Sequence, residues 1–373
     1  MRPVPKPSCF TNFNYTPART RYRQIVEQKF QARDLSYILS LLSYGITSFY
    51  DYQLDDARKA FFAAYKIDAG ERPEAAKIYD WLVVDSRTVY RLKKRERELV
   101  HFYLGLCYLM DDDPARALVE FKKLRQYDQD ASKLPIVSFY LGIIYEKLGK
   151  FDDARIEYRQ LQQMAASGSV ICNLAQMLIA HIDSFERLDL PTELDTLELV
   201  VQVDHQTEKS LGRTEVYIEP YGVVATLPEQ MDSFAVQLSG AEATRKAAQE
   251  AGAKVARGCL RLLGALLLEK ALPGKGKELA EDITDITLGK EEENRDRRAW
   301  GYAPLNFSFA RLRLPAGTEK VRLVFYNRAG VMQGYCDYQL TGEKRRAGLA
   351  YRNQGNKTTY FIIAGLAEEF YVY

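Results

Sequence analysis

The stretch "FYLGIIYEKLGKFDDARIEYRQL", Phe139 to Leu161, decides the fold of the first half of the chain. A single amphipathic helix repeats apolar residues every three or four positions and has no use for Gly149 just ahead of two aspartates. A glycine at this place is typical of a helix end, and acidic residues are typical of the first turn of the next helix. The stretch therefore predicts two helices joined by a tight turn.

The same spacing recurs twice upstream. Counted from Gly142, a tyrosine, an alanine, an aromatic residue and a leucine follow at offsets of 3, 12, 16 and 19. Gly105 is followed by the same classes at all four offsets, and Gly45 matches at 12 and 16 and has an alanine at 19. We expect the glycine to let the second helix approach, with the alanine at the crossing and the aromatic ring beside it. The repeat signature consists of Gly45, Ala57 and Phe61; Gly105, Tyr108, Ala117 and Phe121; and Gly142, Tyr145, Ala154 and Tyr158.

This signature resembles the tetratricopeptide repeat (TPR), although the family's early tryptophan is replaced by Leu41, His101 and Ser138. The glycines at 105 and 142 are 37 residues apart (142 minus 105), close to the family period of about 34, so these two copies should stack directly. A further helix pair is expected around residues 75–95, and a helix over 170–188 is expected to close the stack.

After Pro191 the sequence period changes from about 3.6 to 2, which indicates strands. The segment "TLELVVQVDH" places Leu197, Leu199, Val201 and Val203 on one face. Further strands are expected at 214–220, 222–228 and 233–240, and again at 306–314, 319–328, 330–340 and 358–366. Between these groups, residues 241–272 and 278–287 are expected to be helical.

These patterns predict a multidomain α+β protein. An N-terminal extension (1–17) precedes a domain of TPR-like helical hairpin repeats (18–190). An antiparallel β-sandwich-like domain follows (191–373), with a helical insertion at about 241–288. Trp300, in "DRRAWGYAP", is expected to fill the sandwich core or the seam between the domains.

Composition argues against several classes of function. The 52 basic residues are balanced by 50 acidic ones, so the chain has no general field for nucleic acid or an anionic membrane. The five cysteines form no CxxC pair, which argues against a disulfide framework and a zinc site. The three histidines accompany no catalytic motif, and no apolar run approaches the roughly 20 residues of a membrane span. We expect a protein that is not an enzyme and has no cofactor or metal.

In the TPR family, the first helices of successive hairpins line a concave groove that holds a peptide or helix. The nine positions here that correspond to this groove are all apolar, a larger patch than a monomer leaves exposed. A protein partner could insert an amphipathic helix or an apolar strand; alternatively, neighbouring hairpins, the N-terminal segment or the β-domain cover these residues. The candidate partner-binding groove comprises Leu39, Leu42, Ile46, Phe49, Tyr50, Leu99, Phe102, Leu106, Leu109, Met110, Ile136, Phe139, Ile143, Glu146 and Lys147, with specificity expected at the Glu146 and Lys147 end.

Most of the chain after about Leu35 is similar to a family of uncharacterised bacterial TPR lipoproteins. The similarity is carried by residues 95–124, 135–161, 197–205, 254–262 and 293–318. It implies a protein–protein interaction scaffold in a cell-envelope assembly, in the periplasm or at the outer membrane. Cys9 follows "KPS" and no apolar signal, so a lipid anchor is expected only if the sequence is a processed chain. The alternatives are a cytoplasmic peptide-binding adaptor and a protein that binds cell-wall carbohydrate.

Overall fold

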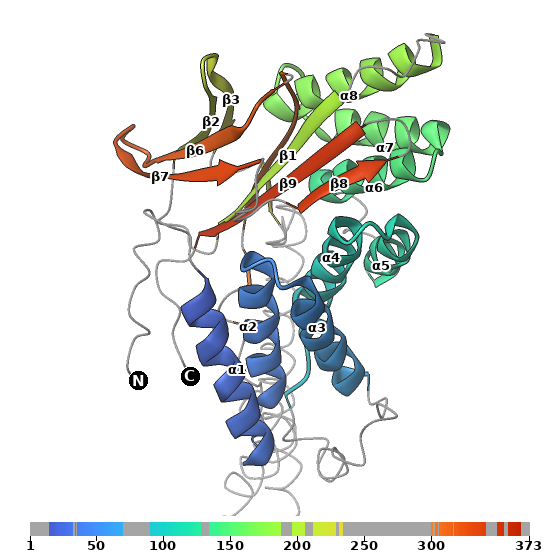
Figure 1. Ribbon diagram of the computed structural model, residues 1–373. Helices are drawn as coiled ribbons and strands as arrows, with labels where there is room; N and C mark the ends of the chain where they lie inside the picture. The colour runs from blue at the N-terminus through green and yellow to red at the C-terminus, as the bar shows by residue number, and fades with distance from the viewer. Residues whose placement is uncertain are drawn as a thin grey trace, which may run out of the picture. The chain divides into compact units, whose positions relative to one another are not determined.

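The computed structural model describes residues 15–32, 34, 36–69, 90–127, 134–187, 196–205, 212–228, 231–233, 300, 303–304, 306–315, 317–340, 349–353 and 357–366. Within these residues, helices come first along the chain and strands follow (Figure 1). The predicted α+β organisation, with helical repeats before a pair of sheets, is confirmed.

Within the described residues, the helical half consists of an opening helix, three hairpins and a closing helix. The hairpins pair α2 with α3, α4 with α5 and α6 with α7, while α1 packs on α2 and α8 on α7. The bounds are α1 (Thr16–Gln31), α2 (Tyr37–Tyr50), α3 (Leu54–Asp68), α4 (Lys94–Met110), α5 (Pro114–Tyr127), α6 (Pro135–Lys147), α7 (Phe151–Met164) and α8 (Val170–Arg187). The interpretation of Phe139–Leu161 as two helices and a turn is confirmed, as is the closing helix.

Each hairpin is held together by contact between its signature glycine and an aromatic ring. A Cβ atom on Gly105 would lie 2.6 Å from two ring carbons of Phe121, closer than side chains approach in folded proteins. Gly45 meets Phe61 in the same way, and the alanine at offset 12 is fully buried in all three copies. The missing side chain therefore sets the distance between the two helices, as the spacing predicts.

The turns of the three hairpins share one backbone conformation. The residue seven positions after the signature glycine has a positive φ in each hairpin. The angle is 56° at Tyr52, 59° at Asp112 and 70° at Gly149. This left-handed conformation reverses the chain, and glycine adopts it without strain. The two other copies keep the same turn at a cost of roughly 1–2 kcal/mol each.

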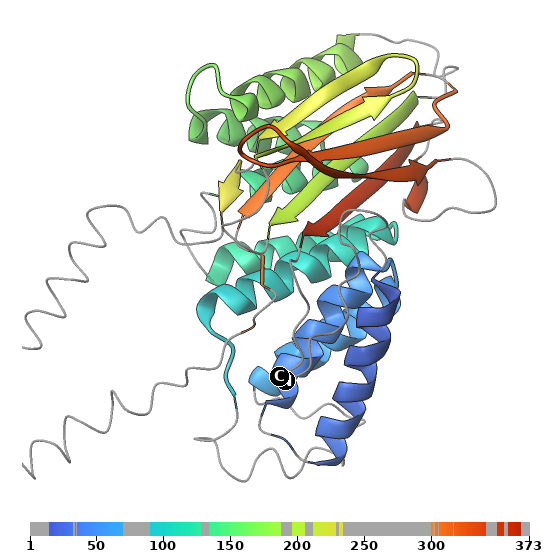
Figure 2. The same cartoon turned by 90° about the vertical axis from the view of Figure 1, so that its left-hand side faces the viewer.

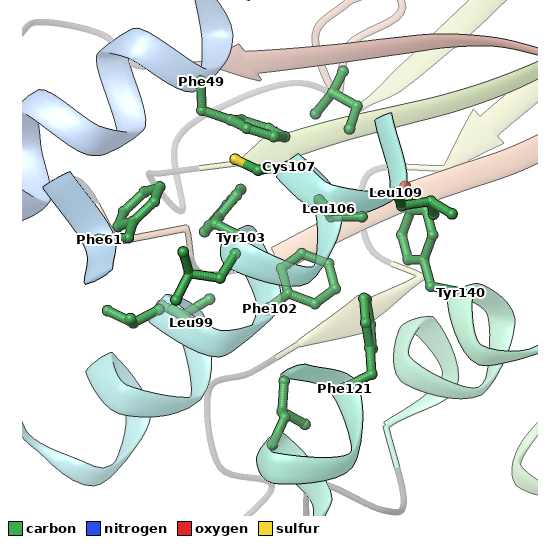
Figure 3. Close-up of a cluster of buried hydrophobic side chains, with 14 of the residues drawn as sticks. Phe49, Phe61, Leu99, Phe102, Tyr103, Leu106, Cys107, Leu109, Phe121 and Tyr140 are labelled. Atoms are coloured by element: carbon green, nitrogen blue, oxygen red, sulfur yellow. The ribbon is translucent and has the colours of Figure 1, made fainter. Parts of the chain in front are cut away.

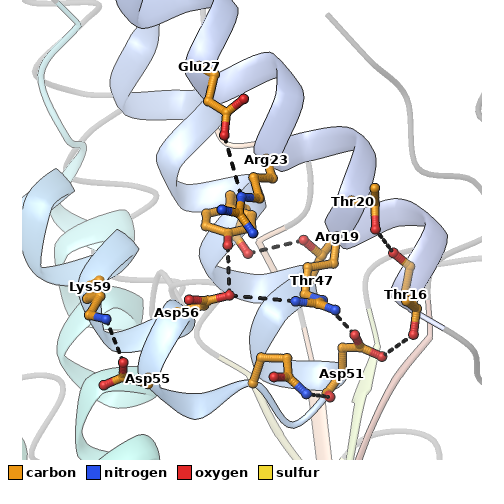
Figure 4. A network of polar contacts seen from close by, with 12 residues as sticks. Thr16, Arg19, Thr20, Arg23, Glu27, Thr47, Asp51, Asp55, Asp56 and Lys59 are labelled. Atoms are coloured by element: carbon orange, nitrogen blue, oxygen red, sulfur yellow. Dashed lines mark hydrogen bonds and ion pairs between the residues drawn. The ribbon is translucent and has the colours of Figure 1, made fainter.

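Polar contacts fix α1 at the start of the stack (Figure 4). Arg19 Nε donates to Asp51 Oδ2 at 2.6 Å, and its Nη1 lies 3.6 Å from a carboxylate oxygen of Asp56. Thr16 donates to the other oxygen of Asp51 at 2.8 Å. Because surface ion pairs contribute only about 0–1 kcal/mol, α1 depends mainly on its buried apolar side chains for its position.

The strands form two sheets. Sheet A has the order β4-β5-β1-β9-β8, and sheet B has the order β3-β2-β6-β7. The bounds are β1 (Thr196–His205), β2 (Arg213–Ile218), β3 (Gly222–Pro228), β4 (Asp232–Ser233), β5 (Asn306–Leu314), β6 (Lys320–Tyr326), β7 (Met332–Gln339), β8 (Leu349–Asn353) and β9 (Lys357–Leu366). Among the described strands, β1 and β9 are parallel and the other pairs are antiparallel. Parallel neighbours need a long connection, and here all the other strands lie between them in the chain.

The alternation in β1 separates two hydrophobic cores. Leu199, Val201 and Val203 face sheet B and form the core of the sandwich. Val200 points the other way and belongs to a cluster that includes the repeat helices. Sheet A therefore lies between α6 to α8 and sheet B, while α1 to α3 extend beyond the end of the sheets (Figures 1 and 2). One hydrophobic cluster thus crosses the expected domain boundary near residue 190.

Some predicted elements lie outside the described residues. One is the helical insertion at about 241–288. The other is the part of the helix pair expected around 75–95 that ends at residue 89. The strand expected at 233–240 is described only at its first residue, Ser233.

Candidate functional site

The candidate groove lies on α2, α4 and α6, the first helices of the three hairpins, and its apolar side chains are nearly all buried. The groove residues that expose 3% or less of their surface are Leu42, Ile46, Phe49, Tyr50, Leu99, Phe102, Leu106, Leu109, Met110, Ile136, Phe139 and Ile143. Leu39, Glu146 and Lys147 are partly exposed.

Part of the groove is buried between neighbouring hairpins. Figure 3 shows rings from several helices directed toward the helix that carries Phe102 and Tyr103. The ring centroid of Phe102 lies 5.7 Å from that of Phe121 in its own hairpin and 5.9 Å from that of Tyr140 in the next. These contacts belong to the stacking of the repeats.

Sheet A covers another part of the groove. The rings of Phe102 and Phe307 of β5 have centroids 5.5 Å apart, and those of Phe139 and Phe309 have centroids 4.8 Å apart. Phe361 of β9 joins the same buried cluster. Of the two readings of the groove, these contacts support the one in which the chain's own β-domain covers part of it, and not the one in which a partner fills it. The physical reason is that β9 is apolar on both faces over residues 360–364 and that β5 directs Phe307 and Phe309 at the helices, so these side chains must be covered.

Polar side chains of β1 also face the helices, and tyrosines bind them. Asp204 accepts hydrogen bonds from Tyr50 at 2.8 Å and from Tyr103 at 2.6 Å. Gln202 accepts one from Tyr140 at 2.5 Å and donates one to Asp204 at 2.5 Å. Tyr103 and Tyr140 both stand two positions before a signature glycine. Successive repeats therefore bind alternate residues of β1, as a TPR groove would bind an extended peptide. These polar residues of β1 are not among the site residues predicted from the sequence.

Asp204 is a fully buried carboxyl group, and no cation among the described residues compensates its charge. Burial raises its pKa to about 6, although the hydrogen bonds from Tyr103, Gln202 and Tyr50 each favour the charged form and act in the opposite direction. Among the described residues, no lysine or arginine contributes to this pKa. Burial raises the pKa of both Tyr50 and Tyr103 well above the usual value, so their hydroxyls stay protonated and donate.

A second polar cluster occupies the end of the groove where specificity was expected. Arg311 of β5 binds Glu146 through both Nη atoms at 2.7 and 2.8 Å, and Glu198 of β1 through Nη2 at 2.8 Å. Burial alone lowers the pKa of Arg311, but the two carboxylates outweigh it and raise the pKa well above its usual value. Lys147 Nζ lies 5.7 Å from the ring centroid of Phe361. This end of the groove is therefore engaged with sheet A.

The end of β9 fits against α2 through a glycine. A Cβ atom on Gly365 would lie 2.6 Å from Cδ2 of Tyr50 and closer still to two other ring carbons. Tyr15 donates a hydrogen bond to the carbonyl oxygen of Gly365. The backbone N–H of Ile363 donates to the hydroxyl of Tyr52 at 3.1 Å. The absence of a side chain at Gly365 is what allows the strand and the helix to meet.

Trp300 lies at the seam between helices and sheet, one of the two places expected for it. It belongs to the cluster that contains the repeat helices, and its ring meets Phe61 edge-on at 6.1 Å. Its backbone N–H donates to Glu96 Oε1 at 2.7 Å.

Sheet B turns one face away from the sandwich core. We call it the outer face of sheet B. Some of its residues alternate with core residues along their strand, and the others are the cross-strand partners of those residues. The face is defined by Tyr217, Val223, Arg322, Val324, Tyr326 and Tyr335. Val223 is 52% exposed and Tyr335 is 46% exposed. The guanidinium of Arg322 lies 4.5 Å from the ring centroid of Tyr335. Unlike the groove, this face carries apolar and aromatic side chains that are accessible.

The described residues offer little for metal or acid–base chemistry. Among them, no three His, Cys, Asp or Glu side chains are grouped so that they could hold a metal ion. His101 Nδ1 lies 2.6 Å from Glu120, and His205 Nε2 lies 3.1 Å from Ser308, both in the interior. In the same part of the chain, no helix has the length and apolar character needed to cross a membrane.

Comparison with known proteins gives a match on the third hairpin. A family model described as "Tetratricopeptide repeat" matches residues 137–164, which cover most of α6 and all of α7. The chain therefore contains a tetratricopeptide repeat, a module that in general serves protein–protein interaction. No curated protein and no solved structure gives a significant match to the chain.

Proposed function

We propose that this protein is a non-enzymatic protein–protein interaction scaffold whose partner binds the outer face of sheet B. The observation that carries the proposal is the contrast between two surfaces. The apolar residues of the groove are buried by neighbouring hairpins and by the chain's own sheet, whereas Tyr335 and Val223 on the outer face are about half exposed. The repeats thus hold the sandwich in place, and the sandwich presents the binding surface.

The composition of the outer face favours a protein partner over a carbohydrate. Tyrosine, arginine and methionine are enriched in protein interfaces, and this face carries Tyr326 and Tyr335 with the exposed Met332 beside them. A sugar stacks on the face of an aromatic ring, but Arg213 lies 4.3 Å from the ring centroid of Tyr326 and Arg322 lies 4.5 Å from that of Tyr335, so a guanidinium already occupies one face of each ring.

Charge on this face points to a partner of mixed charge. Arg322 binds Asp337 at 2.6 Å and Lys320 binds the same carboxylate at 2.7 Å, while Arg213 binds Glu215 at 2.9 Å. Positive and negative groups are interspersed, so the face does not select a polyanion.

Photo-crosslinking tests this proposal with a matched control. A photoreactive amino acid replaces Tyr335 in one variant and Phe62 of α3 in the other, because both side chains are 46% exposed. We expect one protein to crosslink at 335 and not at 62, to bind the purified chain, and to lose at least tenfold in affinity with Val324→Glu. Equal crosslinking at both positions, or unchanged affinity of the Val324→Glu variant, would refute the proposal. Retention of the chain on cell-wall polysaccharide, abolished by Tyr335→Ala, would favour the carbohydrate-binding alternative.

We also propose a location in the bacterial cell envelope, which rests on the sequence resemblance to TPR lipoproteins. Fractionation of cells that express the native gene, with mass spectrometry of the mature N-terminus, tests it. An acylated cysteine in the membrane fraction would support the proposal. An unmodified N-terminus in the cytoplasmic fraction would favour the adaptor alternative.

A further inference from the structure

Asp204 stands where β1 meets the repeat helices, and the described groups that face it are all uncharged. It lies on β1, and the side chains around it come from the residue before α1, from α2 and its turn, from α4 and α6, and from β1 itself. These groups are Tyr15, Tyr50, Tyr52, Tyr103, Tyr140 and Gln202. The neighbouring His205 is bonded to Ser308.

We propose that Asp204 is a pH-sensitive contact that holds sheet A in the repeat groove more tightly in mildly acidic than in neutral solution. The geometry supports this because the carboxyl group is fully buried and joins two repeats to β1. A buried charge that has hydrogen bonds but no cation keeps a large desolvation cost. Protonation removes that cost, and the two tyrosine hydroxyls can reorient to accept as well as donate.

The direction of the pH effect follows from the shift in pKa. Burial raises the pKa of Asp204 from 3.8 to about 6 in the folded chain. A raised folded-state pKa means that the folded chain binds more protons between these two values, so stability falls as pH rises. The contribution is complete below about pH 4 and is lost as pH rises through about 6. Between pH 5.0 and 7.5 this predicts a decrease of roughly tenfold in the ratio of docked to undocked chains.

The pH-sensitive contact at Asp204 goes beyond the proposed function, because it concerns the groove and not the outer face of sheet B. Repeats of this kind hold ligands in their groove. With the contact at Asp204 weakened, the cover over the groove would open more readily in neutral solution than in acidic solution. The outer face could bind its partner whether or not this contact responds to pH.

Hydrogen exchange of the full chain measures the effect at the seam. Protection factors of β9, whose Ile363 N–H is bonded across the seam, are compared at pH 5.0 and 7.5 after correction for the intrinsic exchange rate. The wild type is compared with Asp204→Asn and with the control Asp152→Asn, whose carboxylate is 90% exposed. We expect protection of β9 to fall roughly tenfold in the wild type and in the control, and to change little in Asp204→Asn.

Tyr103→Phe provides a second test that does not depend on the folding of Asp204→Asn. It removes a hydrogen bond that favours the charged form, so the midpoint of the pH effect should move to higher pH. Parallel pH profiles for the wild type and Asp204→Asn would overturn the proposal. An unchanged midpoint in Tyr103→Phe would overturn it as well.

Discussion

Replacement of Gly365 by alanine tests whether sheet A is docked on the helices as described. The new Cβ would lie within 2.6 Å of three ring carbons of Tyr50, where ordinary contacts begin at 3.4 Å. The ring cannot move aside easily, because it packs on Tyr15 and Tyr103 and its hydroxyl is bonded to Asp204. Overpacking of this kind costs about 1–3 kcal/mol.

Urea unfolding followed by circular dichroism measures this loss in the full chain. For a chain of this size, each kcal/mol also lowers the melting temperature by roughly 2–4 °C. The matched control is the pair Tyr50→Leu and Gly365→Ala in one chain, because the smaller side chain makes room for the new methyl group. The two losses should then fall short of additivity by about 1 kcal/mol or more. Wild-type stability for Gly365→Ala, or strictly additive losses, would refute the docking of β9 on α2.

Three further outcomes follow from buried groups. Gly105→Ala should lower the free energy of unfolding by about 1–3 kcal/mol in urea titrations, because the methyl group meets a phenylalanine ring; a neutral effect would contradict the hairpin packing. Arg311→Ala should cost about 3–5 kcal/mol at pH 7, since it leaves two buried carboxylates without their cation. A loss no greater than that of Arg313→Ala would count against this. Burial raises the pKa of the Cys107 thiol, so iodoacetamide at pH 8 should modify it only in unfolding concentrations of urea, as mass spectrometry can show; rapid modification of the native chain would disprove it.

The hairpins could be predicted from sequence because their signature is local. Gly105, Ala117 and Phe121 lie within one hairpin, and their spacing reports a contact between two adjacent helices. The strands were predictable for the same reason, since alternation in a segment such as 306–314 is a property of that segment alone.

The cover over the groove could not be predicted in the same way. Gln202 and Asp204 alternate with apolar residues, a pattern that in most sheets means contact with water. Their partners Tyr103 and Tyr140 lie far away in the chain, and no local pattern joins them. A usable signal did exist in β9, where residues 360–364 make both faces apolar, because such a strand needs cover on both sides. The parallel pairing of β1 with β9 has no local signal at all.

The position of β9 in the chain has a consequence for protein synthesis. The last helix that lines the groove, α6, ends at Lys147. The strand β9, which completes the cover over the groove, ends only at Leu366. About 220 residues (366 minus 147) must therefore be translated in between, which takes roughly 10–40 s at 5–20 residues per second. During that time the hydrophobic groove of the ribosome-bound nascent chain is incompletely covered. Truncated mRNAs that end before the codons for β9 would yield chains with an exposed hydrophobic groove. Such chains would depend on chaperones or aggregate.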